Sequence, residues 1–570
     1  MFKGILLLLF GFIISHFATA LLLSVLYSKH FYILSPFALI SYCISTVAQH
    51  HFLSKLPIIA LCFYIIFSSL PLLVYRVYCG NKTNKNKYGY AKFADESLIR
   101  KMKLNFSEGI VFGILKQTSL QKLFHPFASP SLIRSKEPLS TLLMAPPGTG
   151  KTAGIIIPTL LTITNSVVVH DPKGELYDTT HQARLRLGHK VFFFDIDEAD
   201  SIRFNPFAKN KIPKDPEQIK PYIVNIANII FKSSSKESVD NTNYFIGAAR
   251  NAFIAVACFL TYKEGFTSLL KVRDKIVESD DIIRTFKEMK EDDLKFFKVC
   301  SKKLKKMLDG DINSVLISSA SPDQWAGVMG SLTEKLDYFS DPKIATIVDC
   351  EESYFNAEAL RKEKVSIYLR VKDKDKNKMK PVISMIFESL GSELISKIPE
   401  AGDNQITFIL DEFVRLGRVD VLTDLTSISR GYNFNQIFVI QDLEQISNTY
   451  SKEYMSILES NCAYKIILKQ NNFMTAERIS KIIGAKTDIK TSRSKKEANI
   501  ISNSKNNSTN SISTSQEGIP LVTPQDILNL HEDQCLIIVQ GFAATPILAN
   551  IAWFFKMNSP RPRGSRYRVG

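Results

Sequence analysis

The sequence lacks the short motifs that bind a zinc ion or form a redox-active disulfide. Its eight cysteines include no C-x-x-C pair and no cluster with histidine, and no H-E-x-x-H motif is present. The missing zinc motif argues against a membrane-anchored protease of the AAA+ type. We therefore expect no metal site of the Cys/His type, and we interpret the cysteines as buried, reduced thiols.

Aromatic residues are missing from the basic runs at 302–306, 372–380 and 486–496. A groove that stacks single-stranded bases would interleave aromatic side chains with its cations. Contacts to phosphate alone would still allow sequence-independent movement of nucleic acid. The formal net charge of +16 favours nucleic acid or anionic lipid as a partner, although membrane proteins also carry excess Lys and Arg that sets their topology.

Two long apolar runs lie near the N-terminus, at Ile5–Leu26 and Leu56–Tyr75. At 1.5 Å per residue, each run as a helix is long enough to cross the roughly 30 Å hydrocarbon core of a bilayer. The first run could instead be a cleaved signal peptide with its site at Ala18–Ala20, but its apolar residues continue to Leu26. Phe31–Ala48 could form a third span or a segment at the membrane surface.

Basic residues follow the second run, and no acid precedes Asp95. Positive charge beside a span is typical of the cytoplasmic side of a membrane, so we expect the rest of the chain to be cytoplasmic. We predict a membrane anchor over residues 1–80, with two spans, or three if Phe31–Ala48 also crosses. The basic residues are Arg76, Lys82, Lys85, Lys87 and Lys92.

Short apolar runs that alternate with helical patterns predict a largely parallel α/β sheet from Thr141 onward. Between 221 and 340 such runs are few, and apolar periodicity instead predicts helices at Tyr244–Tyr262, Ser279–Lys306 and Ser314–Tyr338. Residues 486–517 have few apolar positions and are predicted to form a flexible loop. The predicted strands are Thr141–Ala145, Ser166–His170, Lys190–Phe194, Val365–Val371, Gln405–Leu410, Gln436–Ile440, Tyr464–Lys469 and Cys535–Gln540.

A glycine-rich segment that ends in Gly-Lys-Thr follows the first of these strands, and an apolar helical pattern follows it. This order is typical of a P-loop, in which backbone N–H groups and a helix N-terminus hold phosphates. Lys151 would contact the β- and γ-phosphates, and the Thr152 hydroxyl would bind Mg²⁺. Ala145 replaces the first glycine of the motif, and Pro158 could end the helix early. The predicted nucleotide-binding residues are Ala145, Pro146, Pro147, Gly148, Thr149, Gly150, Lys151, Thr152 and Ala153.

Two carboxylates, Asp411 and Glu412, follow the predicted strand Gln405–Leu410. An acidic pair in this place is typical of a Walker B site. Asp411 would bind Mg²⁺, and Glu412 would act as the general base toward the attacking water. Without the upstream P-loop, two solvated acids at a strand end would explain the pair equally well.

The chain resembles the type IV secretion coupling proteins of the TraG/TraD class, and the similar motifs extend over most of its length. The most specific stretch is Leu410–Phe413 with Leu416–Gly417. The other similar stretches are Tyr88–Ala94, Ala145–Pro158, Asp171–Glu175, Phe204–Pro206, Pro520–Pro524 and the strand before Gly541.

The resemblance implies a membrane-anchored ATPase that uses ATP and Mg²⁺ to feed DNA, nucleoprotein or effector protein into a type IV secretion channel. It implies a RecA-like core with an inserted all-α domain, a homohexamer, and a location in the bacterial inner membrane. The corresponding divisions are an anchor at 1–80, core parts at 81–220 and 341–557, the insertion at 221–340 and a basic tail at 558–570. Two site residues also rest on the resemblance: Arg430 would act on the neighbouring subunit's ATP, and Gln441 would sense the γ-phosphate.

Simpler roles remain open for several of these residues. Arg430 could pair with a carbonyl or an acid at a helix end, and Gln441 could be a hydrogen-bonded amide at a strand end. Asp171 and Lys173 end another strand, where a structural Asp-Pro-Lys-Gly turn explains them as well as a catalytic role does. An FtsK-like DNA translocase and a non-hydrolysing cargo receptor are the alternative functions. The stretch Asp411-Glu412-Phe413, the helical segment between the two motifs and the lack of a DNA-reading domain after 557 argue against the translocase.

Overall fold

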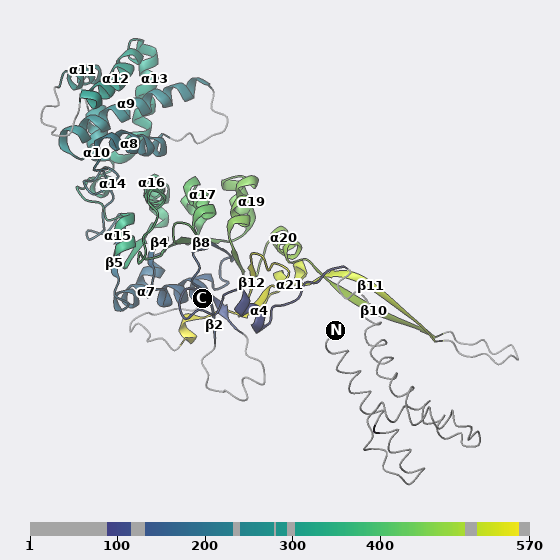
Figure 1. Ribbon diagram of the computed structural model, residues 1–570. Coiled ribbons are helices and arrows are strands. Elements are labelled where there is room, and N and C mark those ends of the chain that lie inside the picture. Colours follow the sequence, from purple (N-terminus) through teal and green to yellow (C-terminus); the bar gives the residue numbers. More distant parts are fainter. Residues whose placement is uncertain are drawn as a thin grey trace, which may run out of the picture. The chain divides into compact units, whose positions relative to one another are not determined.

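The computed structural model describes Phe17 and residues 88–115, 131–231, 240–278, 281–292, 302–495 and 510–557 (Figure 1). Apart from Phe17, the predicted membrane spans lie outside these residues, and so does the basic tail. The chain divides into two compact units: Met1–Tyr90 with Lys486–Ile519, and Ala91–Ala485 with Pro520–Gly570. Each unit is described by itself.

An eleven-stranded sheet forms the centre of the larger unit. Strands β9, β3, β8, β7, β4, β6 and β5 run parallel to one another. Strands β12, β13, β1 and β2 pair with their neighbours in antiparallel fashion. The order is β2 (Leu132–Ser135), β1 (Ile110–Ile114), β13 (Ile547–Asn550), β12 (Gln534–Val539), β9 (Tyr464–Ile467), β3 (Thr141–Met144), β8 (Phe434–Ile440), β7 (Ile406–Leu410), β4 (Ser166–His170), β6 (Val365–Leu369) and β5 (Lys190–Phe194).

The sheet contains every predicted strand, with ends that shift by up to two residues. One correction concerns direction, because β12 runs antiparallel to β9. Its register pairs Leu536 with Ile467 and Val539 with Tyr464. Strands β1, β2 and β13 were not predicted. They are four or five residues long, and β2 and β13 are only partly buried, so their apolar pattern is weak.

Apolar residues cover both faces of the parallel strands, which explains their nearly continuous hydrophobic runs. Leu142 and Met144 belong to one buried cluster, and Leu143 belongs to the other. Helices α16 (Lys376–Ser396), α17 (Asp420–Ile428) and α19 (Lys452–Asn461) contribute to the first cluster, and α6 (Ile157–Thr162) and α7 (Glu175–Arg186) to the second. Smaller helices complete the unit: α4 (Glu96–Lys101), α15 (Ala357–Lys362), α18 (Leu443–Thr449), α20 (Phe473–Ile483) and α21 (Pro524–Leu528).

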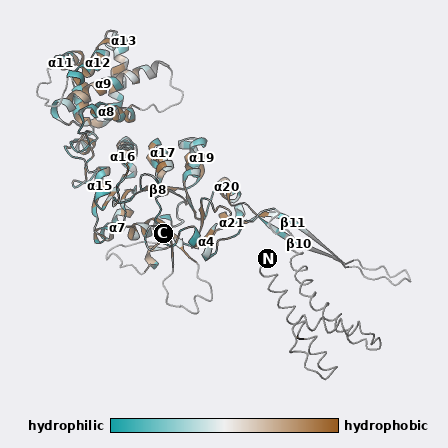
Figure 2. Ribbon diagram, in the orientation of Figure 1, coloured by the Kyte–Doolittle hydropathy of each residue, from teal (hydrophilic) through white to brown (hydrophobic). Residues whose placement is uncertain are grey.

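Among the described residues between β5 and β6, the chain forms helices and no strands. They carry both hydrophobic and hydrophilic residues (Figure 2), and α9 packs against α8, α10, α12 and α13. Before α15, the helices are α8 (Pro216–Ile230), α9 (Asp240–Glu264), α10 (Leu269–Val277), α11 (Ile282–Glu291), α12 (Lys302–Ser318), α13 (Pro322–Leu336) and α14 (Pro342–Val348). Tyr244–Glu264 is long and apolar enough to cross a membrane, but 61% of its most apolar window is buried within the protein.

Several predicted helix bounds were wrong because capping signals override the apolar period. The predicted helix Ser314–Tyr338 is broken, since α12 ends at Ser318 and α13 begins with Pro322 in its first turn. Likewise Ser279–Lys306 contains the separate helix α11, which ends at Glu291. The helical region begins at Pro216 rather than near Pro221, because Asp215 caps α8 by accepting a hydrogen bond from Glu217 N.

The loop predicted at 486–517 is largely a two-stranded sheet of β10 (Ala485–Lys495) and β11 (Asn510–Pro520). At its base Thr487 N donates to the Gly89 carbonyl. Thr and Ile recur along both strands and favour extended backbone. A hairpin can form from backbone hydrogen bonds without a buried apolar face, so low hydrophobicity was a poor guide here. The part of the predicted loop between 496 and 509 lies outside the described residues.

The four cysteines in the described part of the chain are free thiols, as predicted. Cys258, Cys462 and Cys535 are buried, and Cys350 is partly buried. Burial raises the pKa of the Cys535 thiol to about 12, which keeps it protonated.

Candidate functional site

The predicted P-loop connects β3 to a helix at the carboxyl edge of the sheet. Ala145 N donates to the Ile440 carbonyl (2.9 Å), and the Thr149 hydroxyl donates to the Pro146 carbonyl (2.7 Å). Gly148 has a φ of +78°, and a Cβ there would meet nothing within 4 Å. The loop therefore has open space beside Gly148, as a phosphate cradle requires.

Ala145 in place of the motif's first glycine does not strain the loop. Positive φ values at described non-glycine residues occur only at Lys103, Glu412 and Asn433. Ala145 thus has an ordinary backbone conformation that any residue can adopt. Its side chain is fully buried in the second hydrophobic cluster, which explains why a small apolar residue fits.

The helix after the P-loop continues beyond Pro158. Thr152–Ile156 form one π-helical segment, η2, and α6 follows directly with Pro158 in its first turn. Proline lacks a backbone N–H and cannot donate in a regular helix. The wider π-helical turn before it lets the helix continue to Thr162, so Pro158 does not end the predicted helix early.

Lys151 and the acidic pair lie together although 260 residues separate them. Lys151 Nζ lies 3.5 Å from Asp411 Oδ1 and 3.9 Å from Glu412 Oε1. All three side chains are about nine-tenths buried. Strands β3, β8, β7 and β4 are adjacent in the sheet, and their parallel direction brings the residues that follow them to one edge.

Glu412 is held in an unusual backbone conformation at the start of η5 (Phe413–Leu416). Its φ of +51° is in the left-handed region, and Arg415 Nε forms an ion pair with its Oε2. A left-handed non-glycine residue costs free energy and is common at functional sites. The side chain thus lies between two cations, Lys151 and Arg415. The sequence carried no signal for Arg415, since a basic residue one turn after the pair is ordinary.

His170 and Asp171 form the neighbouring strand end. His170 Nδ1 donates to the Asp411 carbonyl (2.6 Å), and burial lowers the His170 pKa to about 4, so the ring is neutral. Burial also raises the Asp171 pKa to about 7, and the charge on Asp411 adds to that rise. Asp171 Oδ2 accepts from Tyr177 N (2.9 Å) in the first turn of α7, which supports the structural explanation of this turn.

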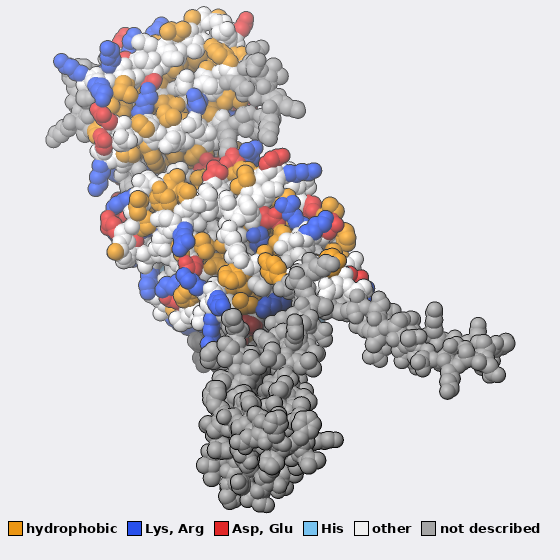
Figure 3. Space-filling model, turned by 45° about the vertical axis from the view of Figure 1, so that its right-hand side comes forward, with side chains coloured by type: hydrophobic (Ala, Val, Ile, Leu, Met, Phe, Trp, Pro, Cys, Tyr) orange, Lys and Arg blue, Asp and Glu red, His pale blue; other side chains and the backbone are white. Residues whose placement is uncertain are grey.

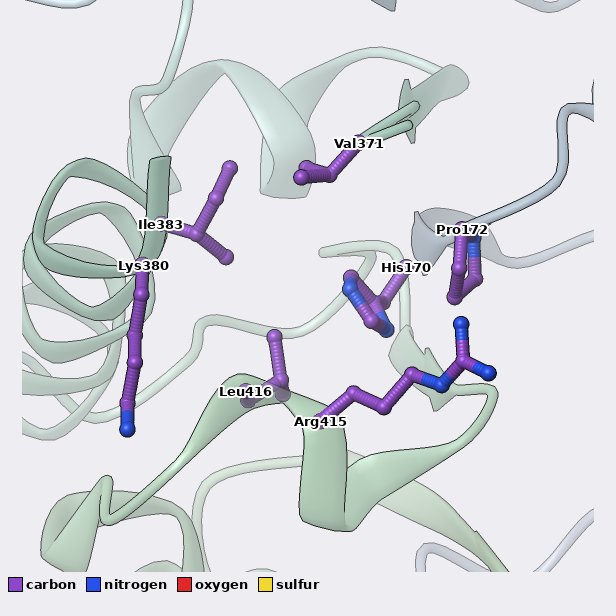
Figure 4. A pocket seen from close by; sticks show the side chains of 7 residues that line it. All are labelled: His170, Pro172, Val371, Lys380, Ile383, Arg415 and Leu416. Atoms are coloured by element: carbon purple, nitrogen blue, oxygen red, sulfur yellow. The ribbon is translucent and has the colours of Figure 1, made fainter. Parts of the chain in front are cut away.

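A pocket opens beside these residues (Figure 4). Arg415 extends toward Pro172 at the end of β4, while Lys380 lies on the opposite side, on α16. The Lys380 chain covers Gly417, where a Cβ would lie 1.8 Å from Lys380 Cε. Gly417, part of the most specific family stretch, therefore provides room for this lysine. The pocket is lined by His170, Pro172, Val371, Lys380, Ile383, Arg415 and Leu416.

The two residues taken from the resemblance lie at opposite edges of the sheet. Gln441 directly follows β8 beside the P-loop, and its Oε1 accepts from Gln445 Nε2 (3.1 Å). Arg430 is exposed and precedes β8, at the other end of that strand. The seven residues of β8 at about 3.3 Å each separate Arg430 from the P-loop edge by about 20 Å. Arg430 is therefore far from the Lys151 site of its own chain.

Comparison with known proteins gives a consistent result. A family model described as "Type IV secretory system Conjugative DNA transfer" matches residues 94–568. The VirD4 protein of Rhizobium radiobacter is 26% identical over 84% of this chain and 65% of its own length. A conjugal transfer protein TraG of Escherichia coli is 24% identical over 63% of this chain and 57% of its own length. The chain thus spans slightly less than two thirds of the length of these relatives.

Solved structures of the bacterial conjugative coupling protein TrwB have a similar fold. The unbound form has a TM-score of 0.54 at 14% identity, covering 82% of this chain and 95% of that one. The complex of TrwB with ADP and Mg²⁺ has a TM-score of 0.55 at 14% identity, covering 83% and 97%. The likeness supports the predicted fold class, a RecA-like P-loop core with an inserted helical segment. Because the family model matches residues 94–568, which is most of this chain, the chain belongs to the type IV secretory system conjugative DNA transfer family.

Proposed function

We propose that this chain is a membrane-anchored ATPase that recruits DNA, nucleoprotein or effector protein and delivers it to a type IV secretion channel by hydrolysing ATP. The observation that carries the proposal is the grouping of Lys151, Asp411 and Glu412 at the carboxyl edge of a parallel sheet in a chain of this family. The anchor and the membrane location rest on the apolar N-terminal runs, and the secretion channel rests on the family description.

The residues at this edge fit a nucleoside triphosphate with Mg²⁺. Gly148 leaves the backbone accessible, and the start of η2 directs N–H groups toward the loop. Thr152 and Asp411 provide the two oxygen ligands that the P-loop class uses for Mg²⁺. Solved complexes of TrwB hold an ATP analogue, or ADP with Mg²⁺. When bound, the metal would neutralise charge on the phosphates.

The chain's own residues would divide the chemistry as follows. Lys151 would neutralise charge that develops on the transferred phosphoryl group, and Glu412 would accept a proton from the attacking water. Gln441 lies beside the P-loop, where it could respond to the γ-phosphate. Arg430 would act in trans in a homohexamer, because about 20 Å of strand separates it from the site of its own chain.

The surface does not single out one kind of cargo. On the face shown in Figure 3, Lys and Arg side chains are interspersed with Asp and Glu. Within the basic run of α12, Lys303 pairs with Glu217 and Lys305 with Asp309. Neutralised lysines contribute less to binding phosphate than free ones. We therefore propose DNA, nucleoprotein and protein as cargo classes without ranking them.

The test of the proposal is ATP hydrolysis and substrate transfer by a Lys151→Ala variant. We expect both to be lost, because no other group in the P-loop supplies that charge. Lys190→Ala is a matched control, since Lys190 is an exposed lysine at the start of the far strand β5, where its Nζ pairs with Glu363 (2.7 Å). Wild-type turnover by Lys151→Ala would overturn the assignment.

A further inference from the structure

A short aromatic segment after the last strand of the sheet lies against the P-loop. β13 ends at Asn550, and Trp553 and Phe555 follow. A Cβ on Gly150 would lie 2.2 Å from Trp553 Cη2. A Cβ on Gly154, one helical turn later, would lie 2.1 Å from Ile551 Cγ2. Glycine at 150 and 154 therefore makes room for this segment, which is about 400 residues away in the sequence.

The segment has three rings, of which Trp553 and Phe555 are held in a stacked arrangement, while Phe554 contacts Phe555 edge-on (centroids 5.5 Å apart, interplanar angle 78°). Trp553 Nε1 donates to Asp533 Oδ1 (2.6 Å), and Ile551 N donates to the Asp533 carbonyl (2.8 Å). The Trp553 and Phe555 rings stack, with centroids 5.5 Å apart and an interplanar angle of 28°. Trp553 is partly buried, while Phe555 is 47% exposed. An exposed ring stacked on an anchored one is available for a further planar partner.

Trp553, on which Phe555 stacks, lies beside the loop that would hold the phosphates. Phosphates held between Gly148 and Thr152 direct the rest of the nucleotide toward the start of the helix, which Trp553 flanks at Gly150 and Gly154. We propose that Trp553 and Phe555 form a stacking platform for the base of the bound nucleoside triphosphate. The platform deepens the proposed function and rests on it. Stacking accepts any base with a π-face, so the platform favours nucleotides over bare polyphosphate.

Tryptophan fluorescence of the full-length chain tests the platform directly. The chain has two tryptophans, and Trp325→Phe leaves Trp553 as the only one. This variant is titrated with a non-hydrolysable ATP analogue and, separately, with inorganic tripolyphosphate. We expect the analogue to change Trp553 emission and tripolyphosphate to leave it unchanged, because only the analogue carries a base. Equal responses to the two ligands would overturn the platform.

Affinity provides a second measurement that does not alter the packing against Gly150. We expect Phe555→Ala to weaken binding of the ATP analogue about tenfold or more and to leave tripolyphosphate binding unchanged. Phe473→Ala is the matched control, because Phe473 is similarly exposed (49%) at the start of α20 and should alter neither affinity. If Phe555→Ala binds both ligands as the wild type does, only the platform is wrong. If the unaltered chain binds neither ligand, the proposed function is wrong and the platform with it.

Discussion

At the residue scale, the two acids that follow β7 have different surroundings. Asp411 faces Lys151 and receives, through its carbonyl, a hydrogen bond from His170. Glu412 lies between Lys151 and Arg415 in a left-handed backbone conformation. The proposed function gives these neighbouring acids different roles, Asp411 toward Mg²⁺ and Glu412 toward the attacking water.

We expect Glu412→Gln to bind ATP but to hydrolyse it about 10²–10⁴ times more slowly, because the amide cannot accept the proton of the attacking water. Asp411, Lys151 and the P-loop remain in place in this variant. Retained radiolabelled ATP and released phosphate are measured on the same sample. A variant that no longer binds nucleotide would show that Glu412 holds the structure of the site rather than acting as the base.

The buried carboxyl of Asp171 should make the stability of the folded protein depend on pH. Its pKa rises from 3.8 in the unfolded chain to about 7 on burial, so the folded state loses stability as pH increases through that range. Asp171→Asn removes this loss while its amide oxygen can still accept from Tyr177 N. We expect wild type and variant to unfold alike at pH 4 and the variant to be more stable at pH 8, by about 1–3 kcal/mol.

Thermal unfolding without added nucleotide at the two pH values is the measurement for Asp171. The comparison between pH values matters more than either value alone, since a packing defect would lower the stability of Asp171→Asn at both. A variant that is less stable than wild type at pH 8 would contradict the assigned protonation.

At the scale of elements, the helical segment between β5 and β6 depends on burial along one face of α12. Ile312 is fully buried against α9, whereas Ile317 on the same helix is 75% exposed. We expect Ile312→Ala to lower the free energy of unfolding by about 2–5 kcal/mol and Ile317→Ala to change it by less than about 0.5 kcal/mol. Denaturant unfolding of both variants measures the difference, and equal effects would contradict the observed packing.

The β10–β11 hairpin and the candidate site residues belong to different compact units. We expect deletion of residues 491–514 to leave the ATPase rate unchanged, because the hairpin base at Thr487, Gly89 and Gly518 is retained. The rate is compared with that of the full-length chain, and substrate transfer is measured beside it. Loss of hydrolysis would show that the hairpin supports the site, whereas loss of transfer alone would indicate that it binds a partner.

At the scale of the whole molecule, Arg430 lies about 20 Å of strand from the site of its own chain, so its proposed role depends on a neighbouring subunit. If Arg430 acts in trans, the specific ATPase activity should rise with protein concentration as subunits associate. Arg430→Ala should bind ATP normally but lose hydrolysis by about 10³-fold or more. Mixing it with Lys151→Ala should restore part of the activity, since a mixed interface pairs an intact P-loop with an intact Arg430.

The mixing experiment separates a shared site from a site within one chain. If Arg430 served its own chain, every subunit in the mixture would carry one broken site and no activity would return. Mixing Lys151→Ala with Glu412→Gln is the control. Both of these residues lie in one site of one chain, so that mixture should stay inactive. Flat concentration dependence together with no rescue would refute the shared site.

The sequence alone determined the parallel part of the sheet and the edge at which the candidate site lies. Each predicted site motif except Arg430 follows an apolar run of strand length, and parallel strands collect the residues after them at one edge. The helical segment between β5 and β6 also follows from local patterns. The family resemblance was readable in the same residues.

Only the tertiary structure decided which distant residues join that edge. The antiparallel strands β12, β13, β1 and β2 bring Trp553 to Gly150, and strand β4 brings His170 and Asp171 to Asp411. The hairpin at 485–520 and the ion pair of Arg415 with Glu412 also became visible only there. Periodicity and motif spacing report contacts within a few residues, whereas these contacts depend on strand order and on side-chain packing across the sheet.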